Sequence, residues 1–254
     1  MLGADTNYPI IEALCEFQFL PDQPWDMTIP GLFYEKVRNE FPIKEQKTDV
    51  GIAFAPQKAG LEHKVEMSQR IQFWKNDKSA VVQIGPNLLA VNQLKPYISW
   101  DAFKPLILSN LNTYIEIAKP RAYKRIGLRY INNIVVEKDK TELKDYFKYY
   151  PFIPEELPQI HGPFNVRVEF PYENGRDMLF LTFASIPPEK PNLSYFLLDL
   201  DYVLSKPESI SLDKADGWIE KAKIILNNVF KACITDSCKE LFKGVANVVT
   251  KSSN

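Results

Sequence analysis

Two aspartates separated by one leucine, Asp199 and Asp201, are the residues of this sequence best placed to do chemistry. They belong to the apolar run 195–204, which predicts a strand, and side chains two positions apart on a strand point to the same side. Two adjacent carboxylates bind Mg²⁺ well and are common where phosphoryl groups are transferred. The alternative is simple alternation, in which the apolar residues of the run enter the core and both carboxylates face water.

A single arginine, Arg129, could complement these acids. It lies on the predicted strand 125–136, on the same face as Asn133. A long cation beside apolar surface either pairs with a carboxylate, such as Asp199, or holds an anionic ligand, for which a phosphate or a carboxylate is the natural choice. The sequence therefore predicts either a structural ion pair or the phosphate-binding group of a metal-dependent enzyme.

Neutral hydrogen-bonding side chains recur on neighbouring predicted strands in the first half of the chain. A polar sheet face of this kind can bind a polar ligand or the backbone of a partner protein, although solvated sheet positions have the same composition. The candidate ligand-binding residues are Gln69, Gln72, Gln83, Asn92, Arg129 and Asn133.

The residue types that metal and cofactor sites require are scarce. The chain has two histidines, too few for a multi-histidine zinc site. Its three cysteines, Cys15, Cys233 and Cys238, are predicted to be buried thiols because their number is odd and their spacing is not that of metal ligands. The turn Gln83-Ile-Gly-Pro-Asn87 has one glycine and no following lysine, so it does not qualify as a phosphate-binding loop. We expect no cofactor.

Charge and composition narrow the class of protein. The 254 residues include 31 Lys and Arg against 32 Asp and Glu, which gives a net charge of −1 and argues against a dedicated nucleic-acid-binding protein. No stretch approaches the roughly 20 apolar residues of a membrane span, and the N-terminal residues lack the pattern of a signal peptide. A cytoplasmic protein without membrane association is therefore expected.

The periodicity of the apolar residues predicts alternating strands and helices. The expected strands are 10–20, 65–74, 80–85, 88–94, 125–136, 165–170, 178–185 and 195–204, with a further strand and a loop within 44–64. The expected helices begin after Thr28, at Trp100, at Thr141 and at Asp213. Short turns between successive strands, including Asn174-Gly175, favour antiparallel pairing.

This order of elements predicts an α+β protein with antiparallel sheets and helices on one face. The order strand, helix, several strands, helix occurs twice, so the chain can be divided into two halves, 1–120 and 121–254, within what is expected to be one unit. The alternative is a single domain of the helix-grip kind, in which one sheet wraps around the C-terminal helix.

Several sequence strings, taken together, resemble a known family. They are Pro9-Ile-Ile-Glu-Ala-Leu14, Trp25-Asp-Met-Thr-Ile-Pro-Gly-Leu32, Gln72-Phe-Trp74, Gln83-Ile-Gly-Pro-Asn-Leu-Leu-Ala-Val-Asn92, Lys95-Pro-Tyr97, Ile126-Gly-Leu-Arg-Tyr-Ile-Asn132 and Leu198-Leu-Asp-Leu-Asp-Tyr202. The chain resembles a sporadically distributed bacterial family of about this length that has a family number instead of a functional name. The resemblance brings no activity and no catalytic residues. The scattered distribution of the family implies an accessory role in a mobile or defence-linked system.

Three functions compete at this point. The absence of a coherent catalytic set favours a non-catalytic binding or interaction module, whose partner is another protein or a small polar ligand. The second is a metal-dependent enzyme for a phosphate-containing substrate, with Asp199 and Asp201 on the metal and Arg129 on the phosphate. The third is an accessory protein for single-stranded nucleic acid, since aromatic residues make up 13% of the chain and could stack on bases.

Overall fold

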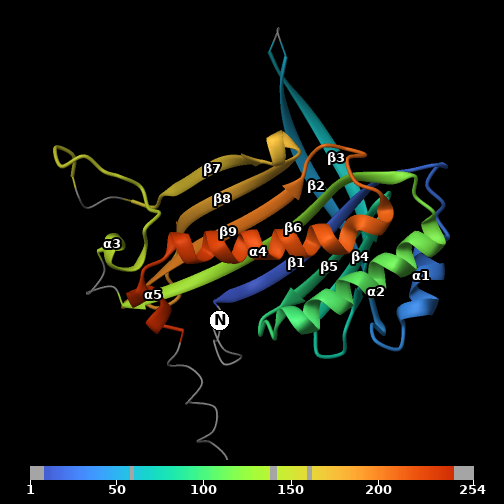
Figure 1. Cartoon of the computed structure of the whole chain (residues 1–254), viewed down its shortest axis with the longest axis horizontal. Helices are drawn as coiled ribbons and strands as arrows, with labels where there is room; N and C mark the ends of the chain where they lie inside the picture. Colours follow the sequence, from blue (N-terminus) through green and yellow to red (C-terminus); the bar gives the residue numbers. More distant parts are fainter. Residues whose placement is uncertain (1–8, 58–59, 138–141, 159–161, 243–254) are drawn as a thin grey trace, which may run out of the picture.

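One antiparallel sheet of nine strands organises the described residues 9–57, 60–137, 142–158 and 162–242 of the computed structural model (Figure 1). The strands are β1 (Ile10–Leu20), β2 (Ile43–Gln57), β3 (Gly60–Trp74), β4 (Ala80–Gly85), β5 (Leu88–Leu94), β6 (Ala122–Glu137), β7 (Asn165–Tyr172), β8 (Asp177–Ile186) and β9 (Leu193–Leu204). The helices are α1 (Ile29–Val37), α2 (Trp100–Ala118), α3 (Leu143–Tyr146), α4 (Ala215–Cys233) and α5 (Asp236–Glu240), with short 3₁₀ turns η2 (Glu173–Gly175) and η3 (Leu212–Lys214). The predicted α+β class is confirmed.

The strand order is β2-β3-β4-β5-β1-β6-β9-β8-β7, with every neighbouring pair antiparallel. The first strand of each half of the chain, β1 or β6, pairs with the last strand of the meander that follows it, β5 or β9. These two first strands also pair with each other at the centre of the sheet. The halves 1–120 and 121–254 therefore contribute to one continuous sheet.

The helices cover one face of this sheet. Figure 1 shows α4 lying across the central strands, with α2 beside it and α1 next to α2. Alternation along the strands supplies the apolar surface that these helices need: in β1, Ala13, Cys15 and Phe17 have no solvent exposure, whereas the residues between them are partly exposed. None of the helices in the described part of the chain is both long and apolar enough to span a bilayer.

The three cysteines belong to this core, as predicted. Cys15, Cys233 and Cys238 are buried and carry free thiols. Burial raises the pKa of the Cys233 and Cys238 thiols to about 12 and that of Cys15 well above its usual value, because a thiolate is poorly solvated in the apolar interior. All three thiols are therefore protonated at neutral pH and act as small apolar side chains.

A buried carboxylate fastens α4 to the sheet. Asp177, at the start of β8, has no solvent exposure. Its two oxygens accept hydrogen bonds from Arg176 Nε (3.1 Å) and Nη2 (2.6 Å), from Tyr202 Oη (3.1 Å) and from Trp218 Nε1 of α4 (3.3 Å). Because a buried charge is stable only when it is paired and hydrogen-bonded, these donors form one unit that fixes the helix against β8 and β9.

Two turn predictions have different outcomes. Asn174 and Gly175 both have positive φ angles, 54° and 81°, so the Asn-Gly pair makes the turn between β7 and β8 as predicted. The first hairpin is longer than the apolar pattern suggests, since β2 and β3 pair from Ile43–Trp74 out to Gln57–Gly60. Backbone pairing thus extends through a polar segment that was expected to contain a loop.

Candidate functional site

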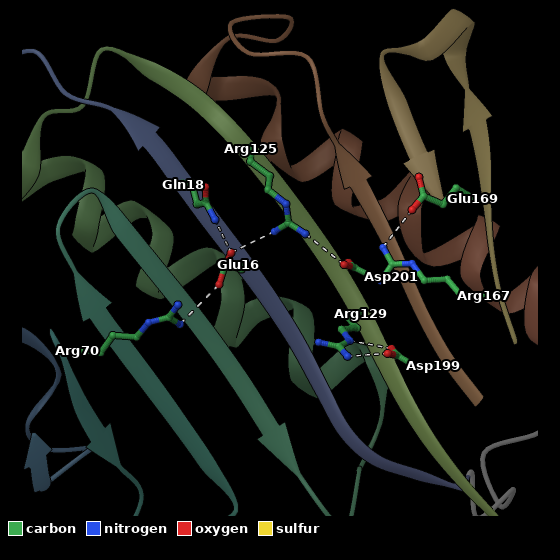
Figure 2. A network of polar contacts seen from close by, with 9 residues as sticks. All are labelled: Glu16, Gln18, Arg70, Arg125, Arg129, Arg167, Glu169, Asp199 and Asp201. Carbon is green, nitrogen blue, oxygen red and sulfur yellow. Dashed lines mark hydrogen bonds and ion pairs between the residues drawn. The ribbon is translucent and has the colours of Figure 1, made fainter. Parts of the chain in front are cut away.

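The face of the sheet opposite the helices, called here the open face, carries a dense set of polar side chains (Figure 2). They stand on the strand positions that alternate with the core residues. Two chains of interactions run across the strands on this face. One consists of ion pairs and the other of amide hydrogen bonds, and together with a separate arginine–aspartate pair they account for most of the residues singled out in the sequence.

The ion-pair chain links four strands. Arg70 of β3 contacts Glu16 of β1 (Nη1–Oε2, 3.6 Å). Glu16 also accepts a hydrogen bond from Arg125 of β6 (Nη1–Oε1, 3.1 Å), whose other terminal nitrogen reaches Asp201 of β9 (Nη2–Oδ2, 3.2 Å). Arg125 therefore bridges Glu16 and Asp201, with one terminal nitrogen of its guanidinium on each carboxylate.

A separate pair, Arg129 and Asp199, lies beside this chain. Arg129 donates from Nε to Oδ1 (2.7 Å) and from Nη2 to Oδ2 (2.6 Å), which is the bidentate geometry of the strongest arginine–carboxylate contacts. The pairing expected from the sequence is confirmed. Its hydrogen bonds raise the pKa of Arg129 above its ordinary value.

The expectation that both acids face water is wrong. Leu198, Leu200 and Tyr202 do enter the core. The side chains of Asp199 and Asp201, however, retain only 13% and 20% exposure. The arginines of the neighbouring strand fold over them, because long side chains cover the shorter ones beside them on a crowded sheet face.

The amide chain, like the ion-pair chain, begins on β3, and it runs from there to β1. Trp74 Nε1 donates to Gln72 Oε1 (3.3 Å), and Gln72 Nε2 donates to Gln83 Oε1 (2.9 Å). Gln83 Nε2 then donates to Asn92 Oδ1 (3.0 Å), and Asn92 Nδ2 to Glu12 Oε1 (2.6 Å). Each amide both donates and accepts, so the chain has one direction and a defined orientation for every side chain.

Two candidate ligand-binding residues do not join the other four. Gln69 is exposed and lies three residues before Gln72, a spacing that places it on the opposite side of the strand. Asn133 is on the same face as Arg129 but lies nearer the C-terminal end of β6, among residues such as Pro9 and Val135. Grouping both residues with the central set was therefore incorrect.

The two chains enclose a hollow of about 280 Å³ at the middle of the open face. Its lining residues come from six strands and are Leu14, Glu16, Arg70, Gln83, Ala90, Asn92, Arg125, Arg129 and Asp201. Most of them are polar, with guanidinium, carboxylate and amide groups facing the same space. This volume is at the small end of ligand pockets and fits a molecule of amino-acid or monosaccharide size.

A glycine that the sequence analysis did not single out makes this arrangement possible. A Cβ placed on Gly127 would lie 2.9 Å from Nη1 and 3.2 Å from Cζ of Arg125. The guanidinium thus rests directly on the bare backbone of β6 on its way to Glu16 and Asp201. A glycine within a strand often marks a close approach of this kind, so the position of Gly127 inside a predicted strand was the sequence signal for this contact.

The arrangement does not fit the metal centre that was considered. Asp199 and Asp201 are each bound to an arginine, and a cation placed between them would have to displace these partners. Among the described residues, no group of three or more His, Cys, Asp or Glu side chains converges as metal ligands do. The geometry is therefore that of paired charges and hydrogen-bonded amides.

The protonation of Asp201 predicts a pH dependence of stability. Burial raises the pKa of this carboxyl to about 6, although Arg125 and Arg129 act to lower it. Its pKa in the unfolded chain is about 3.9, so between about pH 4 and pH 6 the folded state binds more protons than the unfolded state. The stability contributed by this group is therefore fully present below about pH 4 and is lost as the pH rises from about 4 through about 6.

We expect Asp201→Asn to remove this term. Relative to the variant, the wild-type chain should gain on the order of 1–2 kcal/mol between pH 6.5 and pH 4, since one pKa unit corresponds to about 1.4 kcal/mol and the side chain keeps some contact with solvent. Urea unfolding at a series of pH values measures the difference. A difference that stays constant with pH would show that Asp201 titrates normally.

Comparison with protein-family models, with curated proteins and with solved structures finds no match for this chain. The resemblance to a sporadically distributed bacterial family accordingly stays a prediction from the sequence, and the function has to be argued from the site itself.

Proposed function

We propose that this protein is a non-catalytic binding module that recognises a small polar ligand in the hollow of the open face. The observation that carries the proposal is the convergence of arginine, carboxylate and amide groups from six neighbouring strands on one small space. On the other face of the same sheet, the strands are covered by helices and present almost only apolar residues. A polar cluster of this density is expensive to assemble, and ligand recognition is a physical reason to maintain it.

The charges in the hollow indicate the class of ligand. Arg70 and Arg125 are balanced by Glu16 and Asp201, so a simple anion such as inorganic phosphate would meet nearly as much repulsion as attraction. Arg129 uses Nε and Nη2 for Asp199, which leaves Nη1 to point toward the hollow it lines. A ligand with a carboxylate or carbonyl next to a hydrogen-bond donor matches this set, because it can pair with Arg129 and with an acid at once.

The proposal has a direct binding test. Thermal-shift measurements with panels of amino acids and dipeptides, sugars and sugar acids, and nucleotides should identify one class that raises the melting temperature. Calorimetric titration with the best compound should then show that Arg129→Ala weakens its binding roughly 10–100-fold, as expected for a charge-assisted hydrogen bond. Arg121 provides the matched control, since it also pairs with a carboxylate, Glu208, but on an exposed surface.

Each other outcome contradicts the proposal in its own way. If Arg129→Ala and Arg121→Ala bind the compound equally well, the hollow is not the binding site. If no panel stabilises the chain, the hollow is a structural cluster. Heat released on titration with Mg²⁺ or Mn²⁺, and abolished by Asp199→Asn, would support the metal-dependent enzyme instead. Binding of single-stranded oligonucleotides that weakens steeply with salt would support the nucleic-acid alternative.

A further inference from the structure

The strand β7 ends the sheet with an unpaired edge. It pairs with β8 on one side, and no strand of the described residues pairs with its other side. Figure 1 shows it as the outermost strand of its half of the sheet. Val168 and Phe170 on this strand keep 36% and 40% exposure, in contrast to the buried apolar residues of β8 beside them. An exposed edge of this length with apolar side chains is a surface on which another strand can pair.

The direction of the backbone groups on this edge can be read from β8. The carbonyl oxygen of Phe164 accepts a hydrogen bond from Ser185 N (3.1 Å), so even-numbered residues of β7 direct their backbone groups toward β8. The N–H and C=O groups of Arg167 and Glu169 consequently point outward. Pro171 lies at an odd-numbered position, where its missing N–H removes no hydrogen bond to β8.

The charges on this edge are complementary to themselves. Arg167 and Glu169 project from the open face, where their side chains are 55% and 54% exposed and lie 3.3 Å apart. If a second copy pairs antiparallel about a two-fold axis at Val168, Arg167 of each copy stands opposite Glu169 of the other. Both of these pairs are of the hydrogen-bonded type, so their outward N–H and C=O groups join the two chains. Cross-strand pairs of opposite charge stabilise such a ladder.

The apolar side of the edge fits the same register. Val168 then faces Val168 of the partner subunit on the two-fold axis, and Val166 faces Phe170 of the partner subunit. These are non-hydrogen-bonded pairs, in which the side chains approach most closely and bury the most apolar surface. A two-fold axis one residue away, at Arg167 or at Glu169, would instead place two like charges opposite each other, which is unfavourable.

We propose that β7 is a homodimerisation edge, through which two copies of this chain join their sheets into one continuous sheet about a two-fold axis at Val168. The interface is isologous, since the same strand serves both subunits. The occupant is a second copy of this chain because the strand carries the complement of its own charge pattern. This inference is independent of the ligand proposed for the hollow.

Charge exchange tests the register. Sedimentation velocity over a concentration series should show a monomer–dimer equilibrium for the wild-type chain. Arg167→Glu places two acids opposite each other and Glu169→Arg two arginines, so each variant should raise the dimer dissociation constant at least about tenfold. The double exchange R167E/E169R restores opposite charges across the axis and should recover the wild-type value within about threefold. The two single variants, when mixed, should form a heterodimer.

Two measurements keep the result interpretable. Circular dichroism and thermal melting of each variant establish that the monomer is folded, and Arg121→Glu serves as a charge reversal of an exposed ion pair away from β7. A wild-type chain that stays monomeric up to its solubility limit overturns the proposal. A dimer that ignores both single variants, or that the double exchange does not restore, also overturns it, because the contact then lies elsewhere or in another register.

Discussion

Asp177→Ala is expected to lower the free energy of unfolding by about 3–5 kcal/mol, the range measured when one partner of a buried ion pair is removed. The carboxylate is fully buried and serves as acceptor for Arg176, Tyr202 and Trp218. Its loss leaves the buried Tyr202 hydroxyl and Trp218 indole N–H without their acceptor at the junction of β8, β9 and α4, whereas Arg176 keeps Glu173 at 3.9 Å. Such groups cannot recover the solvation they lost on folding, so the penalty falls on the folded state alone.

The measurement is urea unfolding of the wild-type chain and the variant, followed by circular dichroism and by tryptophan fluorescence. Because Trp218 donates to Asp177, the tryptophan fluorescence, to which three other tryptophans also contribute, should change when α4 loosens. Asp177→Asn keeps the shape but replaces one acceptor with a donor, and it should lose less than the alanine variant. Asp213→Ala, at a carboxylate with 70% side-chain exposure, is the control and should change stability by less than about 0.5 kcal/mol.

A loss below about 1 kcal/mol for Asp177→Ala would contradict this account, since it would approach the roughly 0.5 kcal/mol expected of a surface substitution. It would mean that α4 is held by its apolar contacts alone. Trp218, Ile219, Ala222 and Leu226 are all buried against the sheet, so this alternative has a physical basis that the experiment can distinguish.

The local parts of this structure were predictable from the sequence because their causes are local. Alternating apolar residues in 10–20, 125–136 and 195–204 indicated strands with one buried face, and these three strands form the centre of the sheet. Asn174-Gly175 indicated its turn because few residues other than glycine and asparagine adopt positive φ at low cost. The same two-residue period of a strand placed the side chains of Asp199 and Asp201 on one face of the sheet.

The site was only partly predictable because its contacts join distant segments. Arg125 bridges Glu16 and Asp201, which are 109 and 76 residues away in the sequence. The periodicity of the sequence does not predict which strands are neighbours in the sheet. Without the order of the strands, Glu16 was simply a polar residue between core positions. The odd spacing between Gln69 and Gln72 was a signal in the sequence that Gln69 lies on the other side of the strand. Nothing in the sequence signalled that arginines would shield both aspartates from water.

Gly127→Val tests whether the ion-pair chain of the open face contributes to stability. The new side chain would occupy the space of the Arg125 guanidinium, whose Nη1 lies 2.9 Å from the position of a Cβ. Arg125 itself can swing away at little cost because it is long and flexible. The loss arises chiefly at Asp201, whose side chain is only 20% exposed, because Glu16 keeps Arg70 at 3.6 Å. We expect a destabilisation of about 2–3 kcal/mol, below that of a fully buried pair because some water reaches both acids.

A second glycine supplies a matched control with the opposite sign. Gly217 lies in the first turns of α4, and a Cβ added there meets no atom within 4 Å. Gly217→Ala should therefore stabilise the chain by about 0.5–1 kcal/mol, because alanine restricts the unfolded chain and favours the helix.

If Gly127→Val is as neutral as a surface change, the bridge by Arg125 adds nothing to folding. If Gly127→Val costs stability but the charge-neutral Arg125→Met does not, the strain lies in the β6 backbone and the ion-pair chain has no part in it. A loss of similar size in both variants is the result that the Arg125 bridge predicts, and the ligand proposed for the hollow should then bind more weakly to both.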